Sequence, residues 1–392
     1  MMHIVSLVSL LAWIYLIAFH GEFWRSRPVL GMVPDPALGA REPSGVAKVA
    51  VVVPARNEAE TIGHSLRSLL AQDYHGPLSI ILVDDNSTDG TGAIAASLAE
   101  SLSGDRLTVI SGAPLPQGWS GKLWAVHQGL GHEKARSADY VLLTDADIEH
   151  GPGHIAALVA KAEADGPDDG LDLVSEMVRL HCTTAAERAL IPAFVFFFQM
   201  LYPFAWVADP GRKLAGAAGG TMLVRRTALD RIEGVSHIRH QLIDDCALAG
   251  EIKSLGGRIW LGHAEQAASI RVYADWREIW NMIARTAFVQ LKHSLWLLLG
   301  CVVGMGILYG VPPLAVLFAH GLTRLAGILA WLMMALAFQP TLRRYGRSPW
   351  WGFALPAIAL FYLCATAAST ARYFSGRGGG WKSRTYPESK AG

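Results

Sequence analysis

The sequence has few charged residues for its length and no strong excess of either sign. Of its 392 residues, 17% are Asp, Glu, Lys or Arg, 52% are hydrophobic, and the formal net charge is +1. A nucleic-acid partner would require a clustered basic surface, so we set this class of function aside. The apolar composition instead favours one large catalytic domain accompanied by membrane segments.

Cysteines are also scarce and form no recognisable pattern. None of the four stands in a CxxC pair, and no Cys/His spacing resembles a zinc site. We interpret them as small buried hydrophobes in a reducing cytosol, not as disulfide partners.

A glycine-rich phosphate loop is missing after the first predicted strand, where residues 54–60 read PARNEAE. An NAD-dependent dehydrogenase and a nucleotidyltransferase would both be expected to carry glycines there. Both enzyme classes are therefore disfavoured.

Residues 1–22 are predicted to be an N-terminal transmembrane anchor. Residues 3–19 are apolar, near the length that spans a bilayer, and lack the basic start and cleavage site of a signal peptide. Arg25 and Arg27 follow, so the positive-inside rule places the next domain in the cytoplasm. A buried core helix is the alternative. Residues 23–47, rich in Pro and Gly toward their end, are predicted to be a linker.

Residues 48–290 alternate between apolar β-branched runs and helical apolar spacing. The runs predict strands at 49–53, 78–83, 107–110 and 140–143, and the spacing predicts helices at 59–70, 91–102 and 124–130. This alternation predicts an α/β domain with a mostly parallel sheet, in which ligands bind beyond the carboxyl ends of the strands. Residues 190–207 interrupt it and predict a helix in the membrane interface or lining an acceptor groove, with a core helix as the alternative.

Residues 294–372 are predicted to hold C-terminal transmembrane segments, at 295–319, 325–338 and 351–368, of which the second is short. Pro312 and Pro313 should kink or end the first. Arginines at 343, 344 and 347 indicate a loop on the cytoplasmic side of the membrane. Three spans would nevertheless place the basic C-terminal tail on the outside. One segment is therefore re-entrant, or the number of predicted spans is wrong. Residues 373–392 are predicted to be a flexible tail.

Three acidic clusters are the candidate chemistry. Asp84, Asp85 and Asp89 follow the second strand, where they could bind a base or ribose, although one could cap the next helix. Asp145 and Asp147 follow the fourth strand and suit a hard divalent cation, although a solvated loop would also explain them.

The third cluster is the adjacent pair Asp244 and Asp245. Adjacent carboxylates repel, and one could serve as a general base, although acids also stabilise a helix N-terminus. Basic residues near the three clusters would stabilise a leaving diphosphate. The candidates are Lys122, Arg285, Arg225 and Arg226.

Six windows taken together resemble glycosyltransferase family 2. In chain order they read VVVPARNEAETI, VDDNSTD, GKLWAVHQG, LLTDADI, GGTMLVRRTAL and IDDCALAGEIKSLGG, over roughly residues 48–290. With the trailing apolar segments, the arrangement looks most like the bacterial hopene-associated glycosyltransferases and, more distantly, the ceramide glucosyltransferases. The resemblance implies a Rossmann-like GT-A fold in a multi-pass protein of the cell inner membrane.

The resemblance also implies roles for the site residues in the donor half of the reaction. Asp85 would bind the nucleotide base, with Pro54, Arg56 and Glu58 near the nucleotide. The donor would be a nucleotide sugar.

On the same donor, Asp145 and Asp147 would hold the diphosphate through Mg²⁺ or Mn²⁺, with Asp147 the nearer ligand. Asp245 would be the catalytic base, with Asp244 beside it. One displacement by a lipid acceptor, which the resemblance suggests is hopanoid-related, would invert the anomeric carbon.

The sequence departs from many membrane-bound relatives at their (Q/R)xxRW motif. Arg285 is present, but Met282 and Thr286 replace the flanking residues. The missing tryptophan favours transfer of a single sugar over the alternative of a processive polysaccharide synthase. A nonenzymatic scaffold with a degenerate transferase fold is a further alternative, and the retention of every candidate acid disfavours it.

Overall fold

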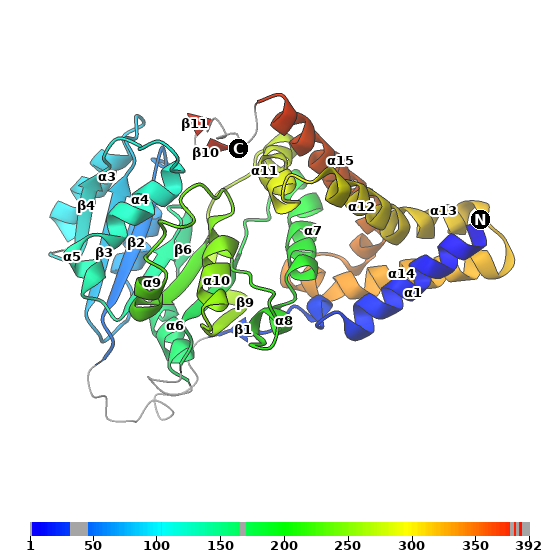
Figure 1. The fold of residues 1–392 in the computed structure, drawn as a ribbon, viewed down its shortest axis with the longest axis horizontal. Helices are drawn as coiled ribbons and strands as arrows, with labels where there is room; N and C mark the ends of the chain where they lie inside the picture. Colours follow the sequence, from blue (N-terminus) through cyan, green and yellow to red (C-terminus); the bar gives the residue numbers. More distant parts are fainter. Residues whose placement is uncertain are drawn as a thin grey trace.

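The computed structural model describes residues 2–31, 46–102, 104–164 and 170–376, and the backbone of residues 380–381 and 384–385. A mixed α/β domain forms one end of the molecule and long apolar helices form the other (Figure 1). The N-terminus lies at the far end of the helical part.

Nine strands form one sheet in the order β1-β9-β7-β8-β5-β2-β3-β4, and β6 pairs with β9. The strands are β1 Val29–Leu30, β2 Val49–Ala55, β3 Leu78–Asp84, β4 Leu107–Ser111, β5 Tyr140–Thr144, β6 Ile148–His150, β7 Leu173–Arg179, β8 Thr221–Arg225 and β9 Ile259–Ser269. The four predicted strands are confirmed as β2, β3, β4 and β5, and these four are parallel. β8 runs antiparallel to both β5 and β7, so the sheet is mixed.

Helices cover both faces of the sheet. They are α2 Ile62–Leu70, α3 Thr91–Leu102, α4 Gly121–Leu130, α5 Glu133–Arg136, α6 His154–Ala162, α9 Arg226–Arg231 and α10 Asp244–Ser254. One core packs α2, α3 and α6 against the sheet. The other core lies under α4 and α10 and continues without a break into the apolar helices. The α/β domain and the helical half therefore share one hydrophobic core.

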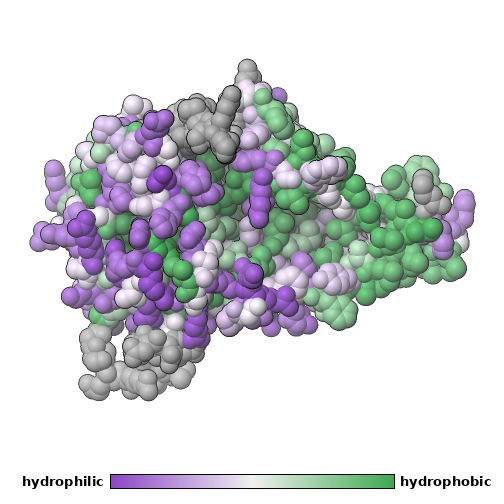
Figure 2. Space-filling view, viewed as in Figure 1, coloured by the Kyte–Doolittle hydropathy of each residue, from purple (hydrophilic) through white to green (hydrophobic). Residues whose placement is uncertain are grey.

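The helical half contains α1 Met2–Phe19, α7 Ala185–Leu201, α8 Phe204–Ala208, α11 Trp276–Gln290, α12 Leu295–Met305, α13 Val311–Phe318, α14 Gly321–Arg344 and α15 Leu355–Phe374. Short turns of helix lie at η1 Phe23–Arg25, η3 Gly306–Gly310 and η4 Pro349–Ala354. Among the described residues, five helical segments are long and apolar enough to cross a membrane: Met2–Phe19, Ala185–Ala208, Leu295–Phe318, Gly321–Arg344 and Pro349–Phe374. Apolar surface gathers over this half and polar surface over the α/β domain (Figure 2).

Near the predicted kink at Pro312, a π-helical turn, η3, interrupts the segment between α12 and α13. Pro312 has no N–H to donate to the preceding turn. The carbonyl of Leu308, one turn earlier, instead accepts a hydrogen bond from the Trp13 indole of α1 at 2.9 Å. The packing of α1 thus satisfies a backbone group that the proline leaves without its helical donor.

Two predictions about segment boundaries were wrong. The second apolar segment is not short, because α14 has 24 residues and continues through Thr341 and Arg344, whose side chains bond to Ser26 and to the Ala264 carbonyl. Residues 23–47 are not a linker throughout, because β1 within them pairs with β9. Residues 32–45, and most of the predicted tail, lie outside the described residues. Within the tail, the backbones of 380–381 and 384–385 pair in an antiparallel manner.

Residues 190–207 fall in α7 and α8. A Thr184/Glu187 capping box starts α7, which packs against α11, α14 and α15. Just over half of an apolar 18-residue window within Ala185–Ala208 is buried in the protein. The helix thus joins the α/β domain to the membrane-type helices, as part of their common core.

Candidate active site

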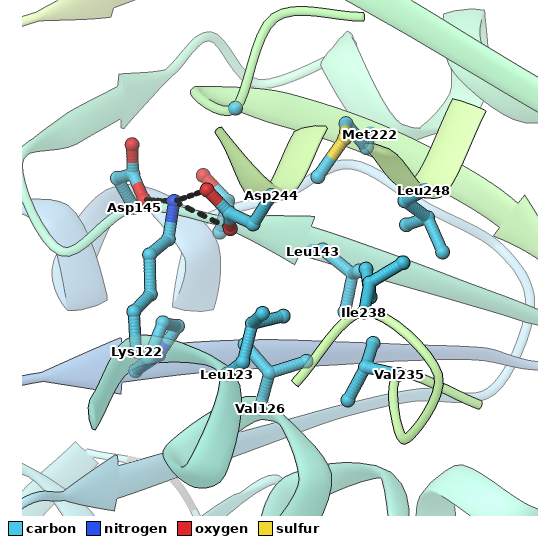
Figure 3. A pocket seen from close by; sticks show the side chains of 13 residues that line it. Lys122, Leu123, Val126, Leu143, Asp145, Met222, Val235, Ile238, Asp244 and Leu248 are labelled. Carbon is cyan, nitrogen blue, oxygen red and sulfur yellow. Dashed lines mark hydrogen bonds and ion pairs between the residues drawn. The ribbon is translucent and has the colours of Figure 1, made fainter. Parts of the chain in front are cut away.

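An ion-pair cluster forms at the carboxyl end of the central strand β5. Asp145 follows β5 directly, Lys122 lies in the first turn of α4, and Asp244 begins α10. The Lys122 Nζ lies 2.9 Å from Asp145 Oδ1 and 3.1 Å from Asp244 Oδ2 (Figure 3). Asp145 and Asp244, which are 23 and 122 positions from Lys122 in the sequence, thus meet it at one edge of the sheet.

Local structure explains why Lys122 faces the acids. The Ser120 hydroxyl accepts a hydrogen bond from the Leu123 N–H and caps the start of α4, while Leu123 and Val126 pack into the core below. Apolar side chains, among them Leu143, Ile238 and Leu248, line the pocket beneath the ion pairs. The lysine side chain runs along this apolar wall, and its charged end reaches the carboxylates.

Asp245 is held by backbone donors beside this cluster. The Gly219 N–H donates to its Oδ2 at 2.9 Å, and the Cys246 N–H donates to its Oδ1 at 2.7 Å. A Cβ added at Gly219 would lie 3.4 Å from both Asp245 Oδ2 and Lys122 Nζ, and 3.8 Å from Asp145 Oδ2. The backbone at Gly219 therefore stands among the three charged groups, and it fixes the orientation of Asp245.

The charges and burial of the site shift the pKa values of Asp245 and Lys122. Burial, followed by the neighbouring Asp244 charge, raises the pKa of Asp245 to about 6, and Lys122 opposes this rise. Burial acts to lower the pKa of Lys122, but the Asp145 and Asp244 carboxylates outweigh it, so the pKa is raised above its ordinary value. The lysine is therefore a fixed cation, whereas Asp245 can exchange a proton near neutral pH.

The residues that were predicted to lie near a nucleotide form a second group at the ends of β2 and β3. The Arg56 guanidinium donates to the Asp85 carbonyl and lies 3.6 Å from the Asp85 Oδ2, and the Asp85 side chain is fully buried. Glu58 follows in the same loop, where its N–H donates to Thr91 Oγ1. Pro54, at the end of β2, lines the same pocket as Lys122. The two groups are thus adjacent at one edge of the sheet.

Asp147 and Arg285 lie apart from the Lys122 ion pairs. Asp147 sits in the turn between β5 and β6, where its carbonyl accepts from the Ile270 N–H. Arg285 is exposed on α11. Burial chiefly raises the pKa of Tyr273; Asp147 adds to this rise and Arg285 opposes it. Both charges therefore lie within electrostatic reach of Tyr273.

The prediction that Arg225 and Arg226 would stabilise a leaving diphosphate was wrong. Because β8 runs antiparallel to β5, Arg225 pairs in register with Tyr140, at the end of β5 opposite to Asp145. Arg225 lies over the Tyr140 ring, and Arg226 pairs with Asp230 at 2.5 Å. Both side chains therefore make their contacts at the edge of the sheet opposite to Asp145.

A buried polar chain behind Asp145 was not predicted. His150 Nε2 lies 3.1 Å from Thr144 Oγ1, the His150 and His154 Nδ1 atoms lie 2.8 Å apart, and His154 Nε2 lies 2.6 Å from Glu176 Oε2. All four residues are buried. The chain links β5, β6, α6 and β7 immediately behind the loop that carries Asp145. The spacing of the two histidines by four was visible, but the partner Glu176 depends on the β7 position.

Replacing Glu176 by Leu is expected to lower the free energy of unfolding by about 2–4 kcal/mol, because buried His154 would lose its partner. The measurement is thermal unfolding of the detergent-purified protein, where the midpoint should fall by several degrees. Glu149→Leu is the matched control, since Glu149 is exposed and pairs with His64 at the surface. Equal midpoints for both variants would contradict a stabilising role for the chain.

Comparisons with known proteins identify similar sequences and a similar fold. The model of the family "Glycosyl transferase family 2" matches residues 50–232, which contain β2 to β8 with Lys122, Asp145 and Gly219. The matched segment is just under half of the 392 residues. The 4,4′-diaponeurosporenoate glycosyltransferase of Staphylococcus aureus (strain MRSA252) is 34% identical over 101 residues, which are 26% of this chain and 24% of that protein.

A solved structure extends the comparison to the whole chain. A mannosyltransferase from Pyrobaculum calidifontis, in complex with GDP-Man and Mn²⁺, superimposes with a TM-score of 0.55 and 18% identity over 95% of this chain and 99% of that one. At this identity the likeness shows the fold alone, a GT-A fold with accompanying helices. The predicted fold class is therefore confirmed.

Proposed function

We propose that this protein is a membrane-bound inverting glycosyltransferase that moves one sugar from a nucleotide-sugar donor to a lipid acceptor at the cytoplasmic face. The observation that carries the proposal is the meeting of Lys122, Asp145, Asp244 and Asp245 at the carboxyl end of β5. Such an edge is where α/β sheets bind ligands, and the family 2 match covers β5 and Lys122.

The cluster contains a separate group for each half of the reaction. Lys122 is a cation beside Asp145 and can stabilise negative charge on a departing diphosphate. Asp245, with its raised pKa, can accept the proton of the acceptor hydroxyl as that oxygen attacks the anomeric carbon and the bond to the diphosphate breaks. A single displacement of this kind inverts the anomeric configuration.

The donor set near β5 fits a divalent metal. Asp145 and Asp147 offer carboxylate oxygens on partly exposed side chains, which suit Mg²⁺ or Mn²⁺. Among the described residues, no group of three or more His, Cys, Asp or Glu could hold a metal alone. Such a metal would therefore complete its coordination with water and donor phosphates, and it would supply charge neutralisation of the leaving group.

The lipid acceptor is supported by the apolar helices that share a core with the domain, and by the relative named for a 4,4′-diaponeurosporenoate acceptor. A hopanoid-related acceptor remains the more specific proposal, from the resemblance of the sequence. Tyr202, at the end of α7, accepts a hydrogen bond from Gln290 of α11, and its electrostatic partners include Asp245. An acceptor hydroxyl could thus approach Asp245 from the helical side.

The course of η4 and α15 supports three membrane spans and a re-entrant segment. After α14 ends, η4 turns back along it: Gln339 donates to the Pro349 carbonyl and Trp331, nearer the middle of α14, donates to the Phe353 carbonyl. The helix α15 then runs to α11, where Arg372 bonds to Asn281 (Figure 1). With α1, α12–α13 and α14 as spans, the basic tail lies on the side of the catalytic domain.

Donor binding is the first test of the proposed function. A panel of UDP-, GDP- and dTDP-sugars would be titrated with Mn²⁺ into detergent-purified wild type and Asp85→Ala. One donor should bind, and the variant should lose it, because Arg56 loses its buried carboxylate partner. Failure of every nucleotide sugar to bind would overturn this donor class, whereas binding unchanged in Asp85→Ala would overturn only the role of Asp85.

The pH dependence follows from Asp245. Its carboxyl must be ionised to act as a base, so kcat/KM should fall about tenfold per pH unit below about pH 6. Because Lys122 lowers this pKa, Lys122→Met should move the fall to higher pH as well as slow the reaction. Initial rates measured from pH 5 to 9 test both statements, and a flat profile below pH 6 would contradict the role of Asp245.

A further inference from the structure

A second hollow, of about 600 Å³, lies where α1 and α14 meet the catalytic domain. Its lining includes Trp24, Arg25 and Arg27 after the end of α1, and Arg343 and Arg344 at the end of α14. We call it the basic hollow. It shares no lining residue with the pocket that contains Lys122 and Asp145. The donor diphosphate therefore does not account for it.

The walls of the basic hollow are fixed to each other. The buried Ser26 hydroxyl lies 3.1 Å from the Thr341 hydroxyl, and Gln199 of α7 also donates to Thr341 at 3.3 Å. The guanidinium of Arg344 donates to the Ala264 carbonyl of β9. The segments that carry the arginines are thus anchored to the protein core. They are held close together although Arg27 and Arg343 are 316 positions apart in the sequence.

The charge of the basic hollow is only partly balanced. Arg25 pairs with Glu22 at 3.4 Å, and Glu265 acts electrostatically on Arg344. Arg27 and Arg343 are exposed, and among the described residues neither guanidinium group makes an ion pair or hydrogen bond. None of the described lining residues is acidic. Clustered cations without local acids repel one another, so a bound anion would stabilise this arrangement.

The position of the hollow identifies the kind of anion. The apolar helix α1 ends at Phe19 and the apolar part of α14 ends near Phe338, so the arginines follow the points where both helices leave the hydrocarbon region. Trp24 lies at the same level, as aromatic residues do at membrane interfaces. Lipid phosphates lie at this depth, and guanidinium groups bind phosphate in a bidentate manner.

We propose that the basic hollow binds the phosphate of an anionic membrane lipid headgroup and anchors the catalytic domain at the bilayer surface. The proposal rests on the membrane placement argued above, and it is independent of the transfer reaction. Arg27 and Arg343 provide the binding charge from two sides, while the paired Arg25 and the anchored Arg344 complete the wall.

Lipid retention measured by native mass spectrometry tests this proposal. The full-length protein would be purified in detergent with added phosphatidylglycerol or phosphatidylcholine. Wild type should retain phosphatidylglycerol preferentially. The double variant Arg27→Gln/Arg343→Gln should retain about ten- to thirtyfold less of it, as expected for two interfacial arginines. The charge-matched control Arg67→Gln/Arg324→Gln removes two exposed arginines elsewhere and should retain as much as wild type.

Three outcomes would overturn the proposal: equal retention of both lipids by wild type, equal losses in both double variants, or displacement of phosphatidylglycerol by millimolar inorganic phosphate. The last would assign the hollow to a free anion. Donor binding is the control for correct folding, and resistance to alkaline extraction is the control for membrane insertion. Neither property is expected to depend on these arginines. Their failure would instead point to the proposed function or the membrane placement.

Discussion

Asp245→Asn is expected to slow sugar transfer by about 10²–10⁴-fold while donor binding is retained. Asn has nearly the same shape as Asp, and its carbonyl oxygen can still accept one of the two backbone hydrogen bonds from Gly219 and Cys246. It cannot accept the acceptor proton. The effect should therefore appear in kcat, with little change in the dissociation constant of the donor.

The neighbouring acid provides the control for this prediction. Asp244 pairs with Lys122 at 3.1 Å and reduces the acidity of Asp245, so Asp244→Asn should change the pH profile more than the maximal rate. Both variants remove one negative charge from adjacent positions of α10. If Asp244→Asn lost more activity than Asp245→Asn at high pH, the assignment of the base would pass from Asp245 to Asp244.

The sheet edge of the candidate site was predictable from the sequence because it depends on local signals. Buried β-branched runs predicted β2, β3, β4 and β5, and parallel strands place the acids that follow them at a common edge. The role of Gly219 was not predictable. It depends on β8 entering the sheet antiparallel between β5 and β7, and no local pattern fixes that register.

The same distinction explains the errors in the membrane segments. Hydropathy detects where the apolar run of α14 ends, near Phe338. The helix continues because Thr341 bonds to Ser26 and Arg344 bonds to β9 of the α/β domain. The buried polar chain was missed for a similar reason, since Glu176 meets His154 only after β7 and α6 have packed together. Tertiary contacts thus decide features that hydropathy and spacing leave open.

Asp147→Ala is expected to reduce transfer by about two to three orders of magnitude, because loss of a carboxylate at the metal position removes charge stabilisation of the leaving diphosphate. Treatment with EDTA should abolish wild-type activity reversibly, and Mn²⁺ should restore it. Asp147 lies in the turn between β5 and β6 and makes no ion pair with Lys122, so the loss should not come from disruption of that cluster.

Metal binding separates this explanation from a defect in folding. Free Mn²⁺ measured by electron paramagnetic resonance, in the presence of a nucleoside diphosphate, should fall with wild type and much less with Asp147→Ala. Glu149→Ala is the matched control, because it removes an exposed acid two residues away whose partner is the surface His64. Full activity in EDTA would reject a metal-dependent mechanism, and unchanged Mn²⁺ binding by Asp147→Ala would move the metal away from Asp147 toward Asp145 and the neighbouring acids.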